Sequence, residues 1–352
     1  MDIRTANERS LSPRGRPWRR PFAGTLVALL LLAGVESALH TDFFLYRYRS
    51  VFAAGRAMDK LLALEAEPTP VLAVGNSRVD NGIHPEIFLR ETGQRVFNLG
   101  LPGAEACNVE GVIERLIERE LIGPGRIEQV LFGLDDGFFQ RVGGLGYEVF
   151  FDARERLLAH DRYRDWLRSI LRLWGYSDSL RTLQEPAKLI RFAQATLGEV
   201  ESWGGNARDT RGFRAADAAM NQDEAQARIQ DAAAIKPPDP EVLECFWAAT
   251  ERLQRAGAGI TIVFMPTLKD RNPFVAANGA PESPYGRVRK MLEEADIRVL
   301  HIDIDGLQTA RYFANAGHLN REGAERFTTL VSARFAAAVV RHDGSVVARA
   351  ND

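Results

Sequence analysis

The chain has few of the features that would tie it to a metal or a nucleic acid. It contains two cysteines, Cys107 and Cys245, which lie far apart and match no metal-ligand spacing. It has 45 Lys and Arg residues against 47 Asp and Glu residues, a formal net charge of −2. No excess of positive charge is present to attract a nucleic acid. We therefore expect no metal site, no cofactor and no nucleic-acid partner.

Two alternatives are open for the cysteines. If the domain is exported, Cys107 and Cys245 could form one disulfide. Each also occupies an apolar position of an expected helix. This pattern favours two separate buried thiols.

The N-terminus carries an asymmetric charge pattern. Residues 1–21 contain six arginines and two acidic residues, and the apolar run 22–39 follows. This is the positive-inside pattern of a single-pass membrane protein, with residues 1–21 as a cytoplasmic tail and the main domain periplasmic or extracellular. The uninterrupted part of the run is short beside the ~20 residues of a spanning helix, so a cleavable signal peptide is the alternative. Residues 35–37 make a poor cleavage site, and an aromatic and basic stretch follows at 43–49, which favours a retained anchor.

Short apolar runs alternate with amphipathic stretches in two parts of the chain. The expected strands are 71–74, 95–97, 127–134, 259–264 and 297–304, and the expected helices are 85–92, 104–122, 240–255, 282–295 and 320–340. This alternation predicts an α/β three-layer sandwich around a parallel sheet of about five strands. In such sheets the ligand site lies beyond the carboxyl ends of the strands.

The pattern divides the chain into segments. We expect a linker helix within 40–69, a catalytic domain formed by 70–136 and 238–341, and a C-terminal tail at 342–352. Residues 137–237 interrupt the alternation with mostly helical stretches, roughly 153–174, 178–196 and 217–234. Long insertions at strand ends commonly serve as lids or substrate-binding subdomains, although a structural cap without substrate contact is the alternative.

Four polar or glycine-rich blocks directly follow expected strands or precede the last helix. Ser77 follows the first strand after a glycine, where its hydroxyl can be exposed as a nucleophile. The segment Asn98–Gly103 is an expected turn in which a glycine lets a backbone N–H face an oxyanion. Asp135 follows the third strand, and His318 lies on the loop before the last helix, where its ring can reach a serine on a neighbouring strand.

In their order, these blocks resemble the SGNH/GDSL hydrolase superfamily, over roughly residues 70–136 and 240–340. The anchored architecture also resembles extracytoplasmic acyl-transfer members of that superfamily, such as the D-alanyl transfer protein and alginate O-acetylation proteins. The resemblance implies a flavodoxin-like sheet and assigns Ser77 as nucleophile and first oxyanion donor, Gly103 as second donor and His318 as general base.

The chain departs from that superfamily's pattern at two positions. Asp135 stands where the family has an oxyanion-donating asparagine, and an ionised carboxylate only accepts hydrogen bonds. Asn108 and Arg78 are then the candidate replacement donors. Asn315 stands where the family has the aspartate that orients the histidine; its amide oxygen can hold the ring without supplying charge. Asp303 or Asp305 are alternative partners for the histidine.

These observations favour an extracytoplasmic serine esterase or O-acyltransferase that works through an acyl-Ser77 intermediate. Anchored members of the resembled superfamily mostly modify cell-envelope or exported polysaccharide, so an acylated or acceptor glycan is the expected partner. The alternative is a weakly active or inactive SGNH-like protein that binds glycan or acts as a scaffold in an export complex. Asp135 and Asn315 support this alternative.

Overall fold

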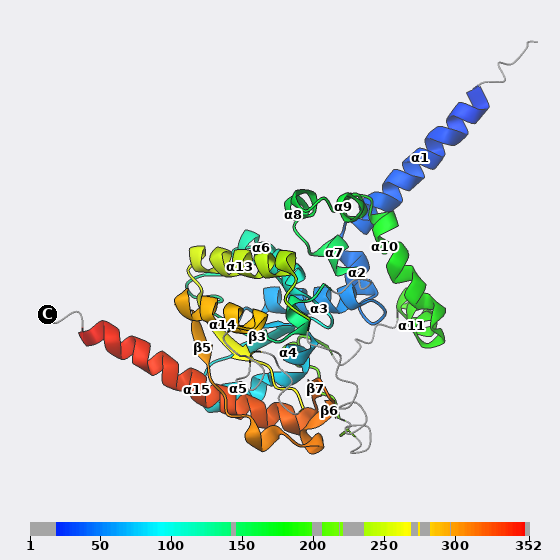
Figure 1. Cartoon of the computed structure of the whole chain (residues 1–352). Coiled ribbons are helices and arrows are strands. Elements are labelled where there is room, and N and C mark those ends of the chain that lie inside the picture. The colour runs from blue at the N-terminus through cyan, green and yellow to red at the C-terminus, as the bar shows by residue number, and fades with distance from the viewer. Residues whose placement is uncertain are drawn as a thin grey trace, which may run out of the picture.

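A five-stranded parallel sheet forms the centre of the molecule (Figure 1). The computed structural model describes residues 19–141, 146–198, 206–217, 219–220, 236–268, 274, 282–295 and 297–348, with backbone alone at 19–22, 178–179 and 338–348. The strands are β1 (Val71–Gly75), β2 (Val96–Gly100), β3 (Gln129–Leu134), β4 (Gly259–Phe264) and β5 (Arg298–Leu300). Their order is β2-β1-β3-β4-β5, and all neighbours pair in parallel. The predicted α/β class and the five-stranded parallel sheet are therefore confirmed.

Helices cover both faces of the sheet. One face packs on α3 (Ala53–Ala66), α6 (Ala106–Glu118), α13 (Pro240–Arg255) and α14 (Pro284–Glu294); the other packs on α4 (Ser77–Gly82), α5 (Pro85–Thr92) and α15 (Arg321–Ala348). Successive strand residues alternate between the two layers: Leu72 and Val74 belong to the first core, and Val71 and Ala73 to the second. This is the three-layer arrangement that period-two side-chain alternation produces when both faces are covered.

The segment expected as a linker helix is part of the core. It forms two helices, α2 (Asp42–Arg47) and α3, and most residues of α3 are buried. Gly55 makes this packing possible, because a Cβ there would lie 2.8 Å from the carbonyl oxygen of Leu45. The linker interpretation was wrong because α3 buries charged side chains together with apolar ones, which weakens the apolar pattern of a core helix.

The expected turn at Asn98 is also different. Asn98 and Gly100 belong to β2, and the Asn98 amide donates to the carbonyl oxygens of Val79 and Ile83, both at 2.7 Å. Its own oxygen accepts from the Gly100 N–H at 2.9 Å. The buried asparagine therefore ties the short helix α4 to the neighbouring strand.

The insertion is helical, as predicted. It contains η1 (Gly137–Phe139), α7 (Tyr147–Phe150), α8 (Arg154–Ala159), α9 (Tyr163–Ile170), α10 (Arg172–Arg181), η2 (Thr182–Gln184) and α11 (Pro186–Leu197). Helices α8 to α11 gather beside α1 (Arg19–Leu39) and α2 (Figure 1), where Tyr176 packs on Phe44 and Phe192 stacks on Tyr48. The expected helix at 217–234 lies almost wholly outside the described residues.

The expected apolar run coincides with α1. The side chains of α1 are described from Ala23 onward; its leucines 26 and 29–32 are exposed, and Leu39 at its end is buried. Within the described part of the chain, no helix combines the length and apolarity needed to cross a membrane.

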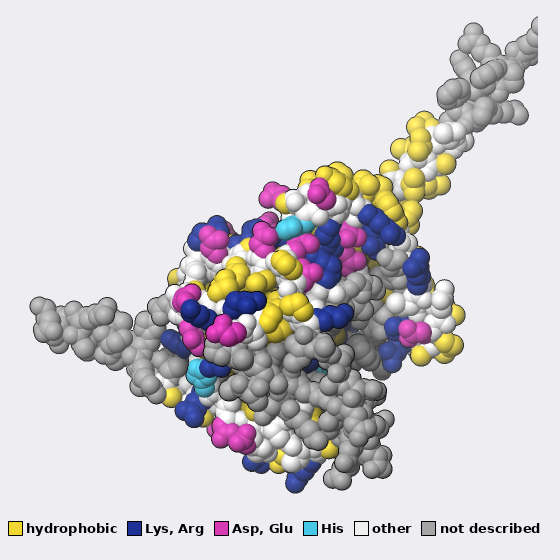
Figure 2. Space-filling model, in the orientation of Figure 1, with side chains coloured by type: hydrophobic (Ala, Val, Ile, Leu, Met, Phe, Trp, Pro, Cys, Tyr) yellow, Lys and Arg dark blue, Asp and Glu magenta, His cyan; other side chains and the backbone are white. Residues whose placement is uncertain are grey.

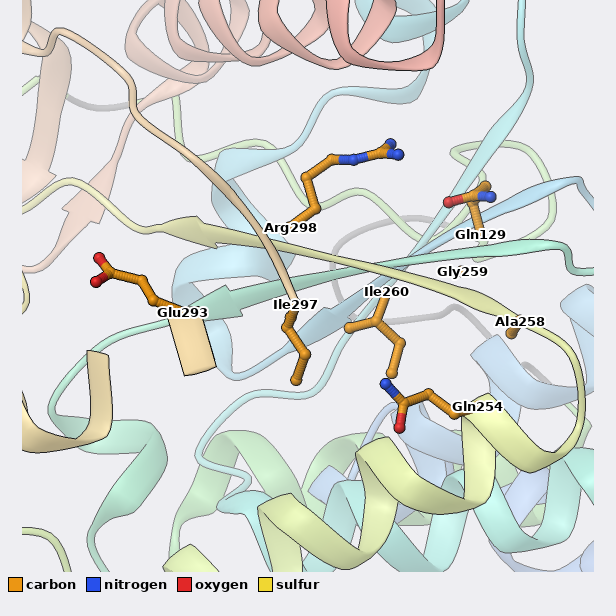
Figure 3. A pocket seen from close by; sticks show the side chains of 8 residues that line it. All are labelled: Gln129, Gln254, Ala258, Gly259, Ile260, Glu293, Ile297 and Arg298. Atoms are coloured by element: carbon orange, nitrogen blue, oxygen red, sulfur yellow. The ribbon is translucent and has the colours of Figure 1, made fainter. Parts of the chain in front are cut away.

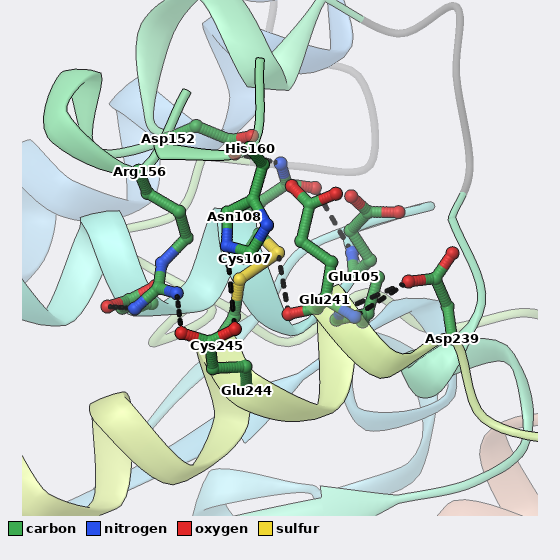
Figure 4. The surroundings of a disulfide bond; sticks show 12 residues. Glu105, Cys107, Asn108, Asp152, Arg156, His160, Asp239, Glu241, Glu244 and Cys245 are labelled. Carbon is green, nitrogen blue, oxygen red and sulfur yellow. Dashed lines mark hydrogen bonds and ion pairs between the residues drawn. A yellow bond between two sulfur atoms is a disulfide. The ribbon is translucent and has the colours of Figure 1, made fainter. Parts of the chain in front are cut away.

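Cys107 and Cys245 form a disulfide between α6 and α13, which pack side by side (Figure 4). The interpretation of two separate buried thiols was therefore wrong. Its premise holds, since both residues are buried, but the adjacent helices bring the two Cα atoms to 4.8 Å. That separation is within the range a disulfide spans.

We predict that the disulfide contributes substantially to stability, because it closes a loop with a sequence separation of 138 residues. Loop-closure entropy for such a loop gives up to about 5 kcal/mol, and measured values are typically 2–4 kcal/mol. Denaturant unfolding should therefore show a lower free energy of unfolding for the Cys107→Ala/Cys245→Ala variant than for the wild type. Dithiothreitol should lower the free energy of unfolding of the wild type and leave that of the variant unchanged. Equal sensitivity of both proteins to dithiothreitol would contradict the prediction.

Candidate active site

Ser77 lies at the carboxyl edge of the sheet, directly after β1. Gly75 ends the strand with φ +155°, and a Cβ there would lie 2.8 Å from the Gly133 carbonyl oxygen. Asn76 then caps α4, because its Oδ1 accepts from the Arg78 N–H at 2.9 Å. This strand–turn–helix places the Ser77 hydroxyl between the ends of β1 and β3, where the sheet order reverses and ligand sites of such sheets form.

A small hairpin brings the histidine to this edge. Strands β6 (Phe313–Asn315) and β7 (His318–Leu319) pair antiparallel, and β7 packs against α4. The His318 Nε2 atom lies 2.7 Å from the Ser77 Oγ, and its Nδ1 lies 2.8 Å from the Asn315 Oδ1. The structure thus brings Ser77, His318 and Asn315 into one hydrogen-bonded chain.

The Asn315 amide has only one orientation that satisfies its neighbours. The Gly317 N–H donates to it at 3.0 Å, and a backbone N–H requires an oxygen as its partner. The atom facing the His318 Nδ1 is therefore also this oxygen, so Nδ1 carries the proton and donates it. The Nε2 atom is left unprotonated and accepts from the Ser77 hydroxyl, which is the tautomer a general base requires.

The surroundings of His318 favour its neutral form. Burial, together with the nearby positive charges of Arg78 and Arg214, lowers its pKa to about 4, against the opposing effect of Asp80. Asp303 and Asp305 do not pair with the ring: both are exposed, and Asp303 accepts from the Asp305 N–H instead. The idea that either aspartate replaces Asn315 was wrong.

Asp135 is fully buried and binds protein groups. Its Oδ1 accepts from the Asn76 amide and the Phe138 N–H, both at 3.0 Å, and lies 3.0 Å from the Arg78 Nη1. Burial raises the pKa of this carboxyl, and the Arg78 charge opposes that rise. Asp135 therefore holds Asn76 and Arg78 in place at the turn that carries Ser77. A carboxylate suits this role because it accepts hydrogen bonds from both side chains.

Arg78 directly follows Ser77, and its charge acts on His318. Its Nη1 also binds the Asp136 Oδ1 at 2.7 Å, and burial of its charge is offset by both aspartates, which raise its pKa. A Cβ placed on Gly317 would lie 3.6 Å from the Arg78 Nε, so the guanidinium also borders the loop that carries His318. The two aspartates hold this charge in place beside the site.

Asn108 lies elsewhere. Its oxygen accepts from the Glu105 N–H at 3.1 Å, and its NH₂ donates to the Asp152 Oδ1 at 2.6 Å, which caps the start of α6 (Figure 4). Both ends of the amide are occupied, so the interpretation of Asn108 as an oxyanion donor was wrong.

Two backbone groups remain as candidate oxyanion donors. Gly103 has φ +74° in the turn after β2, and the Leu101 N–H donates to the Gly75 carbonyl oxygen at 2.9 Å, which fastens this turn to the end of β1. Among the hydrogen bonds between described backbone groups, none uses the N–H of Ser77 or of Gly103. Both N–H groups therefore stay predicted oxyanion donors.

Sequence reasoning missed a buried charged cluster next to the site. Asp80, on α4, forms ion pairs with Lys60 at 2.6 Å, Arg214 at 2.9 Å and Arg56 at 3.6 Å. Burial lowers the pKa of Lys60 to about 7, although Asp80 opposes this shift. The four residues come from three distant parts of the chain, so no spacing in the sequence signals them; only Asp80, three residues after Ser77, is close to a motif.

No group of three or more His, Cys, Asp or Glu side chains in the described ranges could hold a metal ion. A hollow lined by Gln129, Gly259 and Arg298 lies at the amino ends of β3, β4 and β5 (Figure 3). That is the edge of the sheet opposite Ser77, so the hollow is not part of the Ser77 site.

No protein-family model matches this chain, and no curated protein matches it either. The functional argument therefore rests on the geometry of the site and on the sequence motifs.

The pKa of His318 leads to a prediction about pH. A general base must be unprotonated, and this ring ordinarily gains its proton near pH 6.5. Because burial and the neighbouring arginines lower its pKa to about 4, reactivity of Ser77 should persist down to about pH 5 and fall through pH 4. The rate of modification of Ser77 as a function of pH measures this directly. An inflection near pH 6.5 would contradict the described environment of His318.

Proposed function

We propose that the chain is an SGNH-type serine enzyme that transfers acyl groups through an acyl-Ser77 intermediate. The observation that carries the proposal is the chain of hydrogen bonds from the Ser77 Oγ through His318 to the Asn315 oxygen. A protein that only binds a ligand has no need for a hydroxyl aligned on an unprotonated, buried imidazole nitrogen.

The proposed reaction begins with attack of the Ser77 Oγ on the carbonyl carbon of an ester. The serine proton passes to the His318 Nε2, and the carbonyl π electrons move to the oxygen, where the N–H groups of Ser77 and Gly103 would receive the negative charge. Collapse of this intermediate breaks the ester C–O bond, and the leaving alkoxide takes the proton from His318. Water or a sugar hydroxyl then attacks acyl-Ser77 by the same steps, which gives hydrolysis or transfer.

Asn315 would replace the aspartate that orients the histidine in the resembled superfamily, and Arg78 would replace the asparagine that donates to the oxyanion. Asn315 keeps the proton on the Nδ1 of His318 but adds no negative charge to stabilise the imidazolium. Arg78 provides a fixed positive charge beside the developing oxyanion, in place of the amide donor that Asp135 cannot be when ionised.

We place the domain outside the cytoplasm and attached to the membrane. The Cys107–Cys245 disulfide supports the location, because disulfides persist in oxidising compartments and are rare in the cytosol. The arginine-rich residues 1–21 and the exposed leucines of α1 support α1 as the anchor. The proposal that the substrate is an acylated or acceptor polysaccharide of the envelope is supported by the family resemblance alone.

A second function is supported by Asp135 and Asn315, the two residues that depart from the superfamily's pattern. Without a carboxylate on His318, and with Asp135 at the expected donor position, the site could serve as a glycan-binding surface or a scaffold in an export complex. This alternative requires that Ser77 be unreactive.

A fluorophosphonate probe distinguishes the two functions, because it modifies only an activated serine. With the full-length protein in detergent, we expect labelling of the wild type and complete loss in Ser77→Ala. A loss of at least about 10²-fold is expected in His318→Ala, since general-base catalysis contributes about 10²–10⁴.

Matched controls are Ser50→Ala, outside the site, and His301→Ala, an exposed histidine after β5. Both should label as the wild type does. A folded wild-type protein that does not label would refute the enzyme proposal and leave the binding or scaffold function.

A further inference from the structure

Helix α9 has its apolar side facing outward. Tyr163 and Leu167, one turn apart, are 56% and 39% exposed, while Arg168 and Ser169 on the same short helix are buried. Soluble surface helices normally show the reverse arrangement. The outer face of α9 therefore matches an apolar environment better than water.

The buried polar side of α9 is fully used inside the protein. Arg168 lies 3.2 Å from the Asp165 carboxylate and 3.5 Å from the Glu148 carboxylate. The Ser169 carbonyl oxygen accepts from Arg154 at 3.1 Å. The contacts with Glu148 of α7 and Arg154 of α8 hold the polar side of α9 toward the protein, which leaves its apolar residues facing outward.

The apolar surface continues into the next helix. Leu171, between α9 and α10, and Leu173 and Trp174 at the start of α10 are all at least 40% exposed. Together with Tyr163 and Leu167 we call these residues the apolar rim. In Figure 2 hydrophobic atoms gather over this part of the molecule and continue along α1.

Hydrogen bonds join the apolar rim to the end of α1. The Glu36 carboxylate accepts from the N–H of Arg172 and, at 3.1 Å, from the N–H of Leu173. The His40 Nε2 lies 3.0 Å from the Ile170 carbonyl oxygen. Glu36, the one acidic residue of α1, thus binds the first turn of α10, so α1 and the apolar rim are held together at the base of α1.

We propose that the apolar rim rests on the lipid surface around α1, so that α9 and α10 form a membrane-contacting foot of the domain. The inference extends the proposed anchoring by α1. Continuity favours lipid as the occupant: the four consecutive leucines 29–32 are each at least 50% exposed, so this turn of α1 is apolar on all sides. Tyr163 and Trp174, with the exposed Arg164 beside them, are residue types that membrane interfaces favour.

This contact would also orient the candidate active site. In Figure 1, α4 and β7 lie farther from α1 than α9 does. With the rim on the bilayer, the elements that carry Ser77 and His318 would lie farther from the lipid than α9 does. The site would then meet a polymer in the aqueous phase and not a lipid in the membrane.

Depth-dependent quenching tests the proposal on the full-length protein in phosphatidylcholine–phosphatidylglycerol vesicles. The described cysteines are both in the disulfide, so a thiol-reactive, environment-sensitive fluorophore can be directed to Leu167→Cys or Leu171→Cys. Met291→Cys on α14 is the matched control, an exposed apolar residue at 42% exposure away from the rim, and Leu30→Cys reports on α1 itself.

We expect nitroxide-labelled lipid to quench the rim positions at least about threefold more than Met291→Cys. Quenching at Leu30→Cys with none at the rim would overturn the foot and leave the anchor intact. The foot would also be overturned if the rim fluorophore became shielded from water only as the protein concentration rises. A second copy of the protein, and not lipid, would then cover the rim. Absence of quenching at Leu30→Cys would count against the anchor separately.

Discussion

Asp80 is the buried carboxylate on which the arrangement of the candidate site depends. It lies on α4, the helix that begins with Ser77, and pairs with Lys60 of α3 and Arg214 of the insertion. Lys60 also donates to the Gly100 carbonyl oxygen at 2.5 Å, so the same contact reaches the end of β2. Breaking one partner of such a buried pair costs about 3–5 kcal/mol, because the other charge is left unpaired. Asp80 therefore fixes the positions of α4, the end of β2 and the Arg214 segment of the insertion relative to one another.

Two members of this cluster also act on the base. Burial lowers the pKa of His318 most, Arg78 and the cluster residue Arg214 lower it as well, and Asp80 opposes them. The imidazole is thereby kept unprotonated at neutral pH, which suits proton acceptance but gives the imidazolium little stabilisation. An amide oxygen on Nδ1 fixes the ring in the same way that a carboxylate would, without the charge. We infer a site built for orientation more than for basicity.

Much of the fold and of the site could be predicted from the sequence, because both depend on local patterns. The five strands are short, mostly apolar runs, and Ser77 and His318 were found from their places after the first strand and before the last helix. What could not be predicted depends on contacts between distant segments. The disulfide required knowing that α6 and α13 are neighbours, and the Lys60–Asp80–Arg214 contacts join three segments that no periodicity links. The buried role of Asn98 was missed because an asparagine shortly before a glycine-rich segment is typical of a turn, and its burial in β2 overrides that preference.

The central claim is that the Asn315 oxygen, in place of a carboxylate, holds His318 in the form that activates Ser77. The most direct test is the rate at which an activated ester acylates Ser77, followed by mass spectrometry of the full-length protein, in Asn315→Asp and Asn315→Ala against the wild type. We predict that Asn315→Asp acylates at least as fast as the wild type. Asn315→Ala should lose about 10²-fold or more, because the ring is no longer oriented. Acylation of Asn315→Ala at the wild-type rate would contradict the account.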